Sequence, residues 1–186
     1  MFTSLVTKLS VQSLVRPATL QKLNLWAPLP LRLIVGYGFI AHGYAKFARG
    51  PDTFAIVLDT LGVPLPVLLA WVTSLVEMIG GLAILLGVFV PIVSLPMAIV
   101  LLTALFTVHL PYGFFSVKLA EVTASGIKFG PVGYEIILLY LASLATLVLG
   151  GAGPLSIDRW RSRRRAQTHA ATMGQSAACN REIGEC

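Results

Sequence analysis

Six ionisable side chains lie within stretches of the sequence that are otherwise almost entirely apolar. They are Arg32, His42, Lys46, Glu77, His109 and Glu135. A charged group at the centre of a lipid bilayer costs roughly 2.5–3.5 kcal/mol on insertion scales. Histidine and glutamate can also donate, accept and transfer protons. We therefore predict that these residues form an intramembrane polar site, with His42 and Glu77, which lie deepest, as the candidate catalytic pair and the other four as ligand-binding residues.

The composition predicts an integral membrane protein. The chain has 186 residues, of which 56% are hydrophobic and 12% are charged, whereas a soluble domain carries about 25% charged residues. The formal net charge is +6, and five arginines cluster between Arg159 and Arg165. A basic cluster directly after an apolar stretch is typical of the cytoplasmic side of a membrane rather than of a nucleic-acid site. We expect the lipid bilayer, and no nucleic acid, as a partner.

Four segments have the length and apolar character of membrane spans. They run from about 28 to 47, 64 to 89, 91 to 110 and 131 to 149. A helix needs about 20 apolar residues to cross the hydrocarbon core. Prolines at the segment starts suit the first turn of a helix. The sequence therefore predicts an all-α membrane protein with a bundle of four transmembrane helices.

Two connections between these spans have distinct patterns. From Pro51 to Leu61, the apolar residues Phe54, Val57, Leu58 and Leu61 follow helical spacing, with Asp52 and Asp59 at polar positions. This pattern predicts a short interfacial helix after the first span. The segment 111–130, rich in glycine and aromatic residues, is expected to be a loop.

Three parts of the chain follow from these boundaries: a basic N-terminal lead (1–27), the membrane domain (28–160) and a basic, disordered C-terminal tail (161–186). The lead and the arginine cluster both favour the cytoplasmic side. This agrees with an even number of spans, which requires both termini on the same side. The two cysteines, Cys179 and Cys186, lie in the tail. Their position disfavours a membrane enzyme built around an intramembrane Cys-x-x-Cys centre.

Depth in the bilayer predicts how the polar residues group. With a rise of ~1.5 Å per residue and a core of ~30 Å, Arg32 lies ~5 Å and Glu77 ~12 Å from the cytoplasmic edge. We therefore expect an Arg32–Glu77 ion pair in the inner leaflet. The other four residues are expected to converge near the outer surface, where His42 and Lys46 lie one helical turn apart.

Several of these residues also have simpler interpretations. Lys46 can extend to the interface as an ordinary span-end lysine, His109 and Glu135 can be hydrated, and Arg32 can reinforce topology. Two histidines could ligate haem, and histidine with glutamate could hold a metal, but no Cys-x-x-Cys-His, His-x-x-x-His or Glu-x-x-His spacing supports either. We expect no metal or haem.

Small residues accompany the charged ones. Gly80 and Gly81 lie one turn after Glu77, and Gly36 and Gly43 recur along the first span. Such residues ordinarily allow close helix packing in lipid. Gly80 and Gly81 could also leave room for a planar ligand beside Glu77.

The order of motifs resembles the DoxX family of small bacterial membrane proteins. The resemblance rests on R-L-I-V-G-Y-G-F-I-A-H-G-Y-A-K-F from Arg32, E-M-I-G-G-L-A-I-L-L-G from Glu77, and His109 at the end of the third span. Gly133-Tyr134-Glu135 and G-A-G-P-L-S-I-D-R-W from Gly151 follow. It covers about 29–160 and implies a location in the bacterial inner membrane.

The resemblance also implies a redox role. Members of the family resemble the membrane subunit of thiosulfate:quinone oxidoreductase, and some associate with oxidative-stress enzymes. The first hypothesis is therefore a membrane subunit of a redox complex that binds a quinone and acts as an oxidoreductase. Its partner would be another redox protein, and it could also form homo-oligomers. The alternative is a non-enzymatic anchor that recruits soluble redox enzymes. Transport is disfavoured because the sequence shows neither an inverted repeat nor a broken mid-span helix.

Overall fold

The computed structural model describes residues 25–124 and 126–168. Its α-helices are α3 (Pro28–Ala48), α4 (Pro51–Thr60), α5 (Pro66–Leu86), α6 (Val90–Ala104) and α7 (Glu135–Gly150). Helix α6 continues into a π-helical segment, η2 (Leu105–His109), and a 3₁₀ turn, η3 (Leu110–Tyr112). Residues 157–168 form a further helix. The strands are β1 (Leu119–Thr123) and β2 (Gly126–Phe129).

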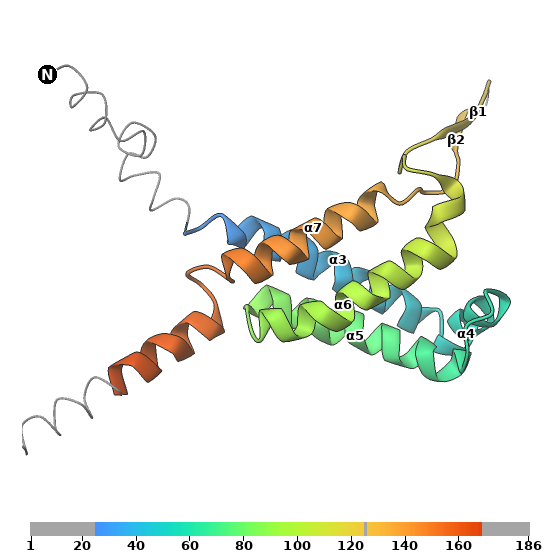
Figure 1. Cartoon of the computed structure of the whole chain (residues 1–186). Coiled ribbons are helices and arrows are strands. Elements are labelled where there is room, and N and C mark those ends of the chain that lie inside the picture. The colour runs from blue at the N-terminus through green and yellow to red at the C-terminus, as the bar shows by residue number, and fades with distance from the viewer. Residues whose placement is uncertain (1–24, 125, 169–186) are drawn as a thin grey trace, which may run out of the picture.

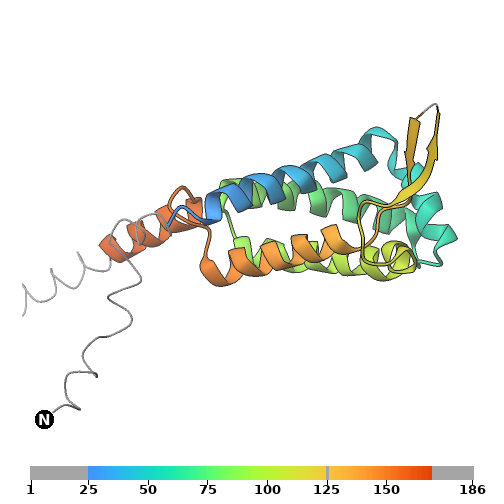
Figure 2. The same cartoon turned by 90° about the horizontal axis from the view of Figure 1, so that it is seen from above.

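The four longest α-helices run side by side in alternating directions. Figures 1 and 2 show α3 beside α5 in one layer and α6 beside α7 in the other. The start of α3 and the helix over 157–168 lie at the same end of the bundle, and α4 and the two strands lie at the opposite end (Figure 1). We call these the basic end and the hairpin end. Both ends of the described chain are therefore on one side.

Within the described part of the chain, two helical segments are long and apolar enough to cross a membrane, Pro66–Leu86 and Val90–Tyr112. Helix α7 is apolar but shorter, with 16 residues. Large apolar side chains face outward on all four bundle helices, including Ile34, Ile79, Ile99 and Leu139, each more than half exposed. The core between the two layers contains Val35, Phe39, Ile84, Met97 and Leu144.

Glycines set the close approach of α3 and α5. A Cβ atom added to Gly81 would lie 2.7 Å from the backbone oxygen of Gly36 and 2.9 Å from the backbone nitrogen of Ile40. A Cβ on Gly43 would lie 2.9 Å from the carbonyl oxygen of Ser74. The backbones are thus nearly in contact, which confirms the packing role predicted for these small residues.

Replacing Gly81 with alanine should therefore destabilise the bundle by about 2–3 kcal/mol, because the methyl group meets backbone atoms that cannot move independently. Gly150→Ala is the matched control, since a Cβ there meets nothing within 4 Å. Thermal unfolding in detergent measures both. Equal midpoints for the two variants would show that α3 and α5 are not packed this closely.

Helix α4 confirms the helix expected after the first span, but its buried face differs from the expected one. Pro51, Ala55 and Leu58 are buried, and the latter two pack with Ala70 of α5. Val57 and Leu61 were expected on the same face but are 47% and 38% exposed. The face that meets α5 therefore contains the small Ala55 together with Leu58.

The prediction of an all-α fold with a plain loop over 111–130 is wrong in one respect. Strands β1 and β2 pair antiparallel, with an irregularity between Leu119 and Glu121. Because opposite residues share a face, the Val122–Ile127 pair and the Leu119–Phe129 pair lie on one side, and Glu121 and Lys128 lie on the other. The latter two form an exposed ion pair at 3.0 Å. Ala120, which lies between Leu119 and Glu121, has no opposite residue in β2, and this extra residue keeps the apolar side chains on one face.

The boundaries of the predicted segments shift by a few residues. The fourth helix begins at Glu135 rather than at 131, and the second begins at Pro66 rather than at 64. Residues 161–168, expected to be part of a disordered tail, are helical. Most of the basic lead and both cysteines lie outside the described residues.

Candidate functional site

A partly buried ion pair between Lys46 and Glu77 is the centre of the polar site. The ammonium Nζ atom donates to both carboxylate oxygens at 2.7 Å. The side chain of Glu77 is 7% exposed and that of Lys46 is 22% exposed. The ammonium also lies 4.7 Å from the centre of the Phe54 ring, in a cation–π contact. Helices α3, α4 and α5 thus each supply one side chain.

The expected Arg32–Glu77 ion pair is wrong, and the register of α3 against α5 explains why. Gly36 packs against Gly81, and Gly43 against Ser74, so Arg32 lies about level with Leu85. That position is about two helical turns, ~12 Å, beyond Glu77. Side chains on a helix also lean toward its N-terminus. In this antiparallel pair, Lys46 and Glu77 lean toward each other, whereas Arg32 leans away.

Arg32 instead ties three chain segments together at the basic end. Its Nε atom donates to the carbonyl oxygen of Ile84 at 3.0 Å, and Nη2 donates to that of Leu85. Nη1 donates to the carbonyl oxygens of Ala152 at 2.8 Å and Leu155 at 3.1 Å. The first two bonds supply donors to carbonyl groups in the last turn of α5, where Ile84 also accepts from the backbone N–H of Gly87 at 3.1 Å. Only 2% of Arg32 is exposed, so it is a structural clamp and not part of the proposed ligand site.

Gly87 makes room for this clamp. Its φ of 64° lies in the left-handed region, and an added Cβ would lie 2.5 Å from Cβ of Ser156 and 2.8 Å from Nη2 of Arg32. Its carbonyl oxygen accepts a hydrogen bond from the backbone N–H of Asp158 at 3.1 Å. Only glycine fits both the turn and the contact.

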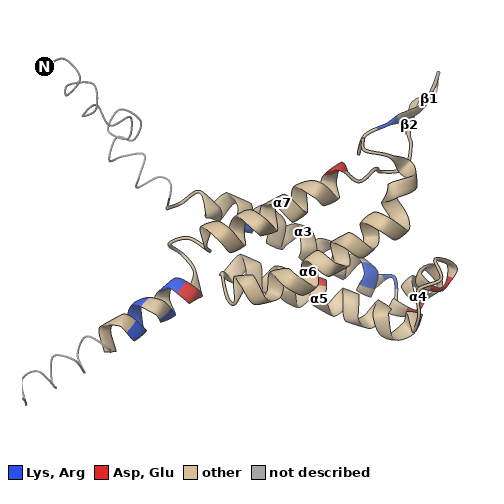
Figure 3. Cartoon of the chain, viewed as in Figure 1, with Lys and Arg blue, Asp and Glu red and all other residues tan. Residues whose placement is uncertain are grey.

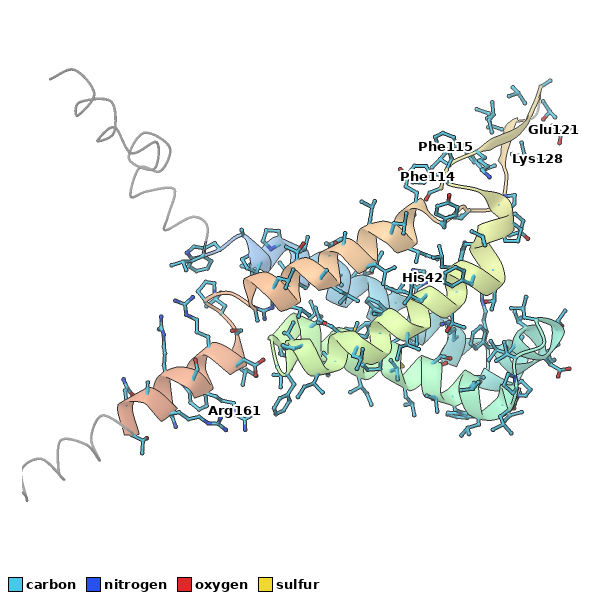
Figure 4. The ribbon with its side chains drawn as sticks, in the orientation of Figure 1. His42, Phe114, Phe115, Glu121, Lys128 and Arg161 are labelled. Atoms are coloured by element: carbon cyan, nitrogen blue, oxygen red, sulfur yellow. The ribbon has the colours of Figure 1, made fainter. Side chains whose placement is uncertain are left out.

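His42 lies one helical turn before Lys46 on α3, nearer the middle of the bundle, and its side chain is exposed. Figure 4 labels it on α3. The side chain makes no hydrogen bond or ion pair within the described part of the chain. An imidazole in this position can exchange a proton with a molecule that reaches α3 beside Lys46.

His109 and Glu135 do not join the other two residues with which they were expected to converge. Nδ1 of His109 lies 2.8 Å from the carbonyl oxygen of Val132. The carboxylate of Glu135 accepts a hydrogen bond from the backbone N–H of Ser116 at 3.1 Å. Both side chains anchor the chain at the base of the β-hairpin, because their hydrogen bonds go to backbone atoms there. No interaction among the described residues links either of them to His42 or Lys46.

The two glycines after Glu77 face neighbouring helices. A Cβ on Gly80 would lie 2.7 Å from the sulfur of Met97 in α6, and Gly81 contacts α3 as described above. Because helix atoms occupy the space beside both residues, we include neither in the proposed ligand site. Across residues 25–124 and 126–168, no group of three or more His, Cys, Asp or Glu side chains could hold a metal ion.

Comparison with known proteins decides the family. The model of the DoxX family matches residues 27–110. This segment is a DoxX domain. The matched segment includes Arg32, His42, Lys46, Glu77 and His109, and therefore the whole Lys46–Glu77 site. The expected resemblance extended to residue 160, and its later motifs lie outside the matched segment. DoxX proteins are membrane proteins, which agrees with the apolar outer surface of the bundle.

A relative from Haemophilus influenzae is 28% identical over 130 residues, which cover 69% of this chain and 85% of that protein. It is described as an uncharacterized protein. No solved structure matches the chain. The comparisons thus identify a DoxX domain over residues 27–110 and indicate no substrate or reaction.

Two residues were not predicted from the sequence, Phe54 at the Lys46–Glu77 pair and Asp158 at the basic end. Phe54 covers the ammonium of Lys46, and Asp158 accepts a hydrogen bond from the backbone N–H of Val90 at 3.4 Å. A signal for Phe54 was its place on the predicted amphipathic helix, a few residues after Lys46. Asp158 stands next to the arginine cluster, where an acidic residue suggests a specific contact.

Proposed function

We propose that this DoxX protein is the integral membrane subunit of a redox complex and binds a quinone-like ligand at His42, Lys46 and Glu77. The observation that carries the proposal is the buried Lys46–Glu77 pair. Intramembrane ionisable groups are costly and commonly mark ligand or proton pathways. His42, with no partner in the described structure, stands one turn away on the same helix.

The proposed chemistry assigns a role to each side chain. Reduction of a quinone to a hydroquinone takes two electrons and two protons, and the electrons come from a partner redox protein. His42 passes a proton to one ring oxygen. The ammonium of Lys46 stabilises negative charge that develops on the other oxygen. Glu77, as a carboxylate, keeps Lys46 charged and in place. Solvent at the exposed side chain of His42 supplies the second proton and reprotonates the imidazole after turnover.

Ligand retention tests this proposal. His42→Ala and Lys46→Met should each reduce the quinone content of the purified protein at least about fivefold, because each loses a hydrogen bond that a buried ligand needs. His109→Ala is the matched control, since its imidazole binds the hairpin base, and it should retain wild-type content. Extraction and mass spectrometry give quinone per protein. Wild-type content in both site variants, or none in the wild type, would refute the site.

We further infer that α3, α5, α6 with η2, and α7 each span the membrane, with both termini in the cytoplasm of a bacterial cell and α4 at the opposite interface. Alternating helix directions, outward-facing apolar side chains and basic residues at one end support this arrangement (Figure 3). The charged residues Arg32 and Glu77 of these helices are buried.

Reporter fusions test the arrangement. A fusion after Ala166 should report a cytoplasmic location, and a fusion within 113–118 should report a periplasmic one, because arginines orient the segment that they flank. A periplasmic signal from the fusion after Ala166 would reverse the orientation. Equal signals at both sites would contradict an odd number of crossings between them.

A scaffold is the alternative function. The arginines of the helix over 157–168 are largely exposed, and this helix projects from the basic end (Figures 1 and 3). Such a surface suits an acidic soluble partner. Loss of partner copurification in Arg163→Gln, with no quinone in the wild type, would favour this function.

A further inference from the structure

A cavity at the basic end has the chemistry of a lipid headgroup site. Its volume is about 460 Å³, and it lies where α3 begins, α6 begins and α7 ends. Apolar side chains such as Leu25, Pro91 and Val148 form one part of its wall. Ser156, Arg159 and Ser162, from the start of the helix over 157–168, form another. One wall thus suits hydrocarbon and the other suits a polar, negatively charged group.

Arg159 differs from the other arginines of this helix. It is half-buried and lines the cavity, and its guanidinium makes no ion pair or hydrogen bond within residues 25–124 and 126–168. Arg161 lies 5.2 Å from the centre of the Phe89 ring, and Arg164 lies 3.8 Å from that of Trp160. Figure 4 shows Arg161 on the same helix. Arg159 is therefore a cation at the cavity with its hydrogen-bond donors available.

Asp158 also lines the cavity, but its charge is offset. Its carboxylate accepts from the backbone N–H of Val90 at 3.4 Å and attracts the guanidinium of Arg32. Arg32 and Arg159 together outweigh this single carboxylate. The local charge is positive, which favours an anion.

The helix start fixes the cationic wall. The Oγ atom of Ser156 accepts a hydrogen bond from the backbone N–H of Arg159 at 3.3 Å, as an N-terminal helix cap does. The Arg32 clamp holds the preceding carbonyl groups of Ala152 and Leu155. The cationic wall is thus tied to the helices that form the apolar wall.

We propose that this cavity binds the phosphate of an anionic phospholipid of the inner leaflet, with Arg159 as the donor to the phosphate and the acyl chains along the wall near Val148. Guanidinium groups bind phosphate through paired, charge-assisted hydrogen bonds. The inference rests on the membrane orientation proposed above, and it concerns the end of the bundle opposite the Lys46–Glu77 site.

Native mass spectrometry of the purified full chain tests the lipid site. Phosphatidylglycerol should remain bound more strongly than phosphatidylethanolamine. Arg159→Gln should lower phosphatidylglycerol occupancy about fivefold or more, because one arginine near an anionic lipid contributes about that factor. Arg163→Gln, on the same helix but outside the cavity, should change it less than twofold. Equal losses in both variants would overturn the site in favour of diffuse charge attraction.

Two further measurements distinguish a bound phospholipid from bound free phosphate. Val148→Trp fills the apolar wall without changing charge and should also lower phosphatidylglycerol occupancy, which keeps the proposal testable if Arg159→Gln does not fold. Inorganic phosphate should not raise the unfolding temperature as phosphatidylglycerol does. Equal protection by phosphate, lost in Arg159→Gln, would overturn the lipid assignment. Quinone content measured on the same samples reports the other site separately.

Discussion

Arg32→Leu should lower the free energy of unfolding by about 4–6 kcal/mol, the largest effect expected for a single substitution in this protein. The carbonyl groups of Leu85, Ala152 and Leu155 lose their donor, and that of Ile84 keeps only the backbone N–H of Gly87. Each buried polar group left without a partner costs about 1–3 kcal/mol. The leucine cannot replace any of these bonds. Thermal and denaturant unfolding in detergent measure the loss.

Two variants serve as controls. Arg32→Lys keeps the charge but cannot reach all four carbonyl groups, so it should be intermediate. Arg163→Leu changes an exposed arginine and should shift stability by less than about 0.5 kcal/mol. If Arg32→Leu is no worse than Arg163→Leu, the clamp does not hold the basic end together.

Lys46→Met should cost about 3–5 kcal/mol, because it leaves the carboxylate of Glu77 buried without its counter-ion. Glu77→Gln should be milder, since the amide still accepts a hydrogen bond from the lysine. In a double-mutant cycle the two positions should couple by at least about 1.5 kcal/mol. Unfolding of the wild type, both single variants and the double variant gives this coupling.

The exposed pair Lys128 and Glu121 provides the control cycle. These side chains are 72% and 54% exposed, and such surface pairs contribute less than about 1 kcal/mol. A second cycle, between Arg32 and Glu77, should be additive because Arg32 binds only carbonyl groups. Strong coupling between Arg32 and Glu77, with none between Lys46 and Glu77, would support the Arg32–Glu77 ion pair that depth alone predicts.

The sequence predicted the helices of this fold well because their signals are local. Apolar length and prolines at helix starts mark where α5 and α6 begin, whereas the second span was expected to run to 89 and α5 ends at Leu86. The helix after the first span was also foreseen from its periodicity. Its rotation was not, because that depends on which side chains α5 can accommodate.

The composition of the polar site was predictable, but its pairing was not. Depth alone placed Arg32 nearer to Glu77 than it is, since it took no account of the register that Gly36 and Gly81 impose. The lean of side chains toward each helix N-terminus adds to that difference. Both the register and the direction of the side chains affect the pairing only when two helices pack against each other. The same holds for His109 and Glu135, whose partners are backbone atoms of the hairpin base.

Photolabelling tests the central claim most directly. A photoreactive quinone analogue, applied to membranes that contain the intact chain and followed by peptide mass spectrometry, shows where the headgroup lies. Labels should fall on the hairpin-end halves of α3 and α5, close to His42, Lys46 and Glu77, and excess unlabelled quinone should prevent them. Labels confined to the basic end, or unaffected by that competition, would contradict a quinone site at the Lys46–Glu77 pair.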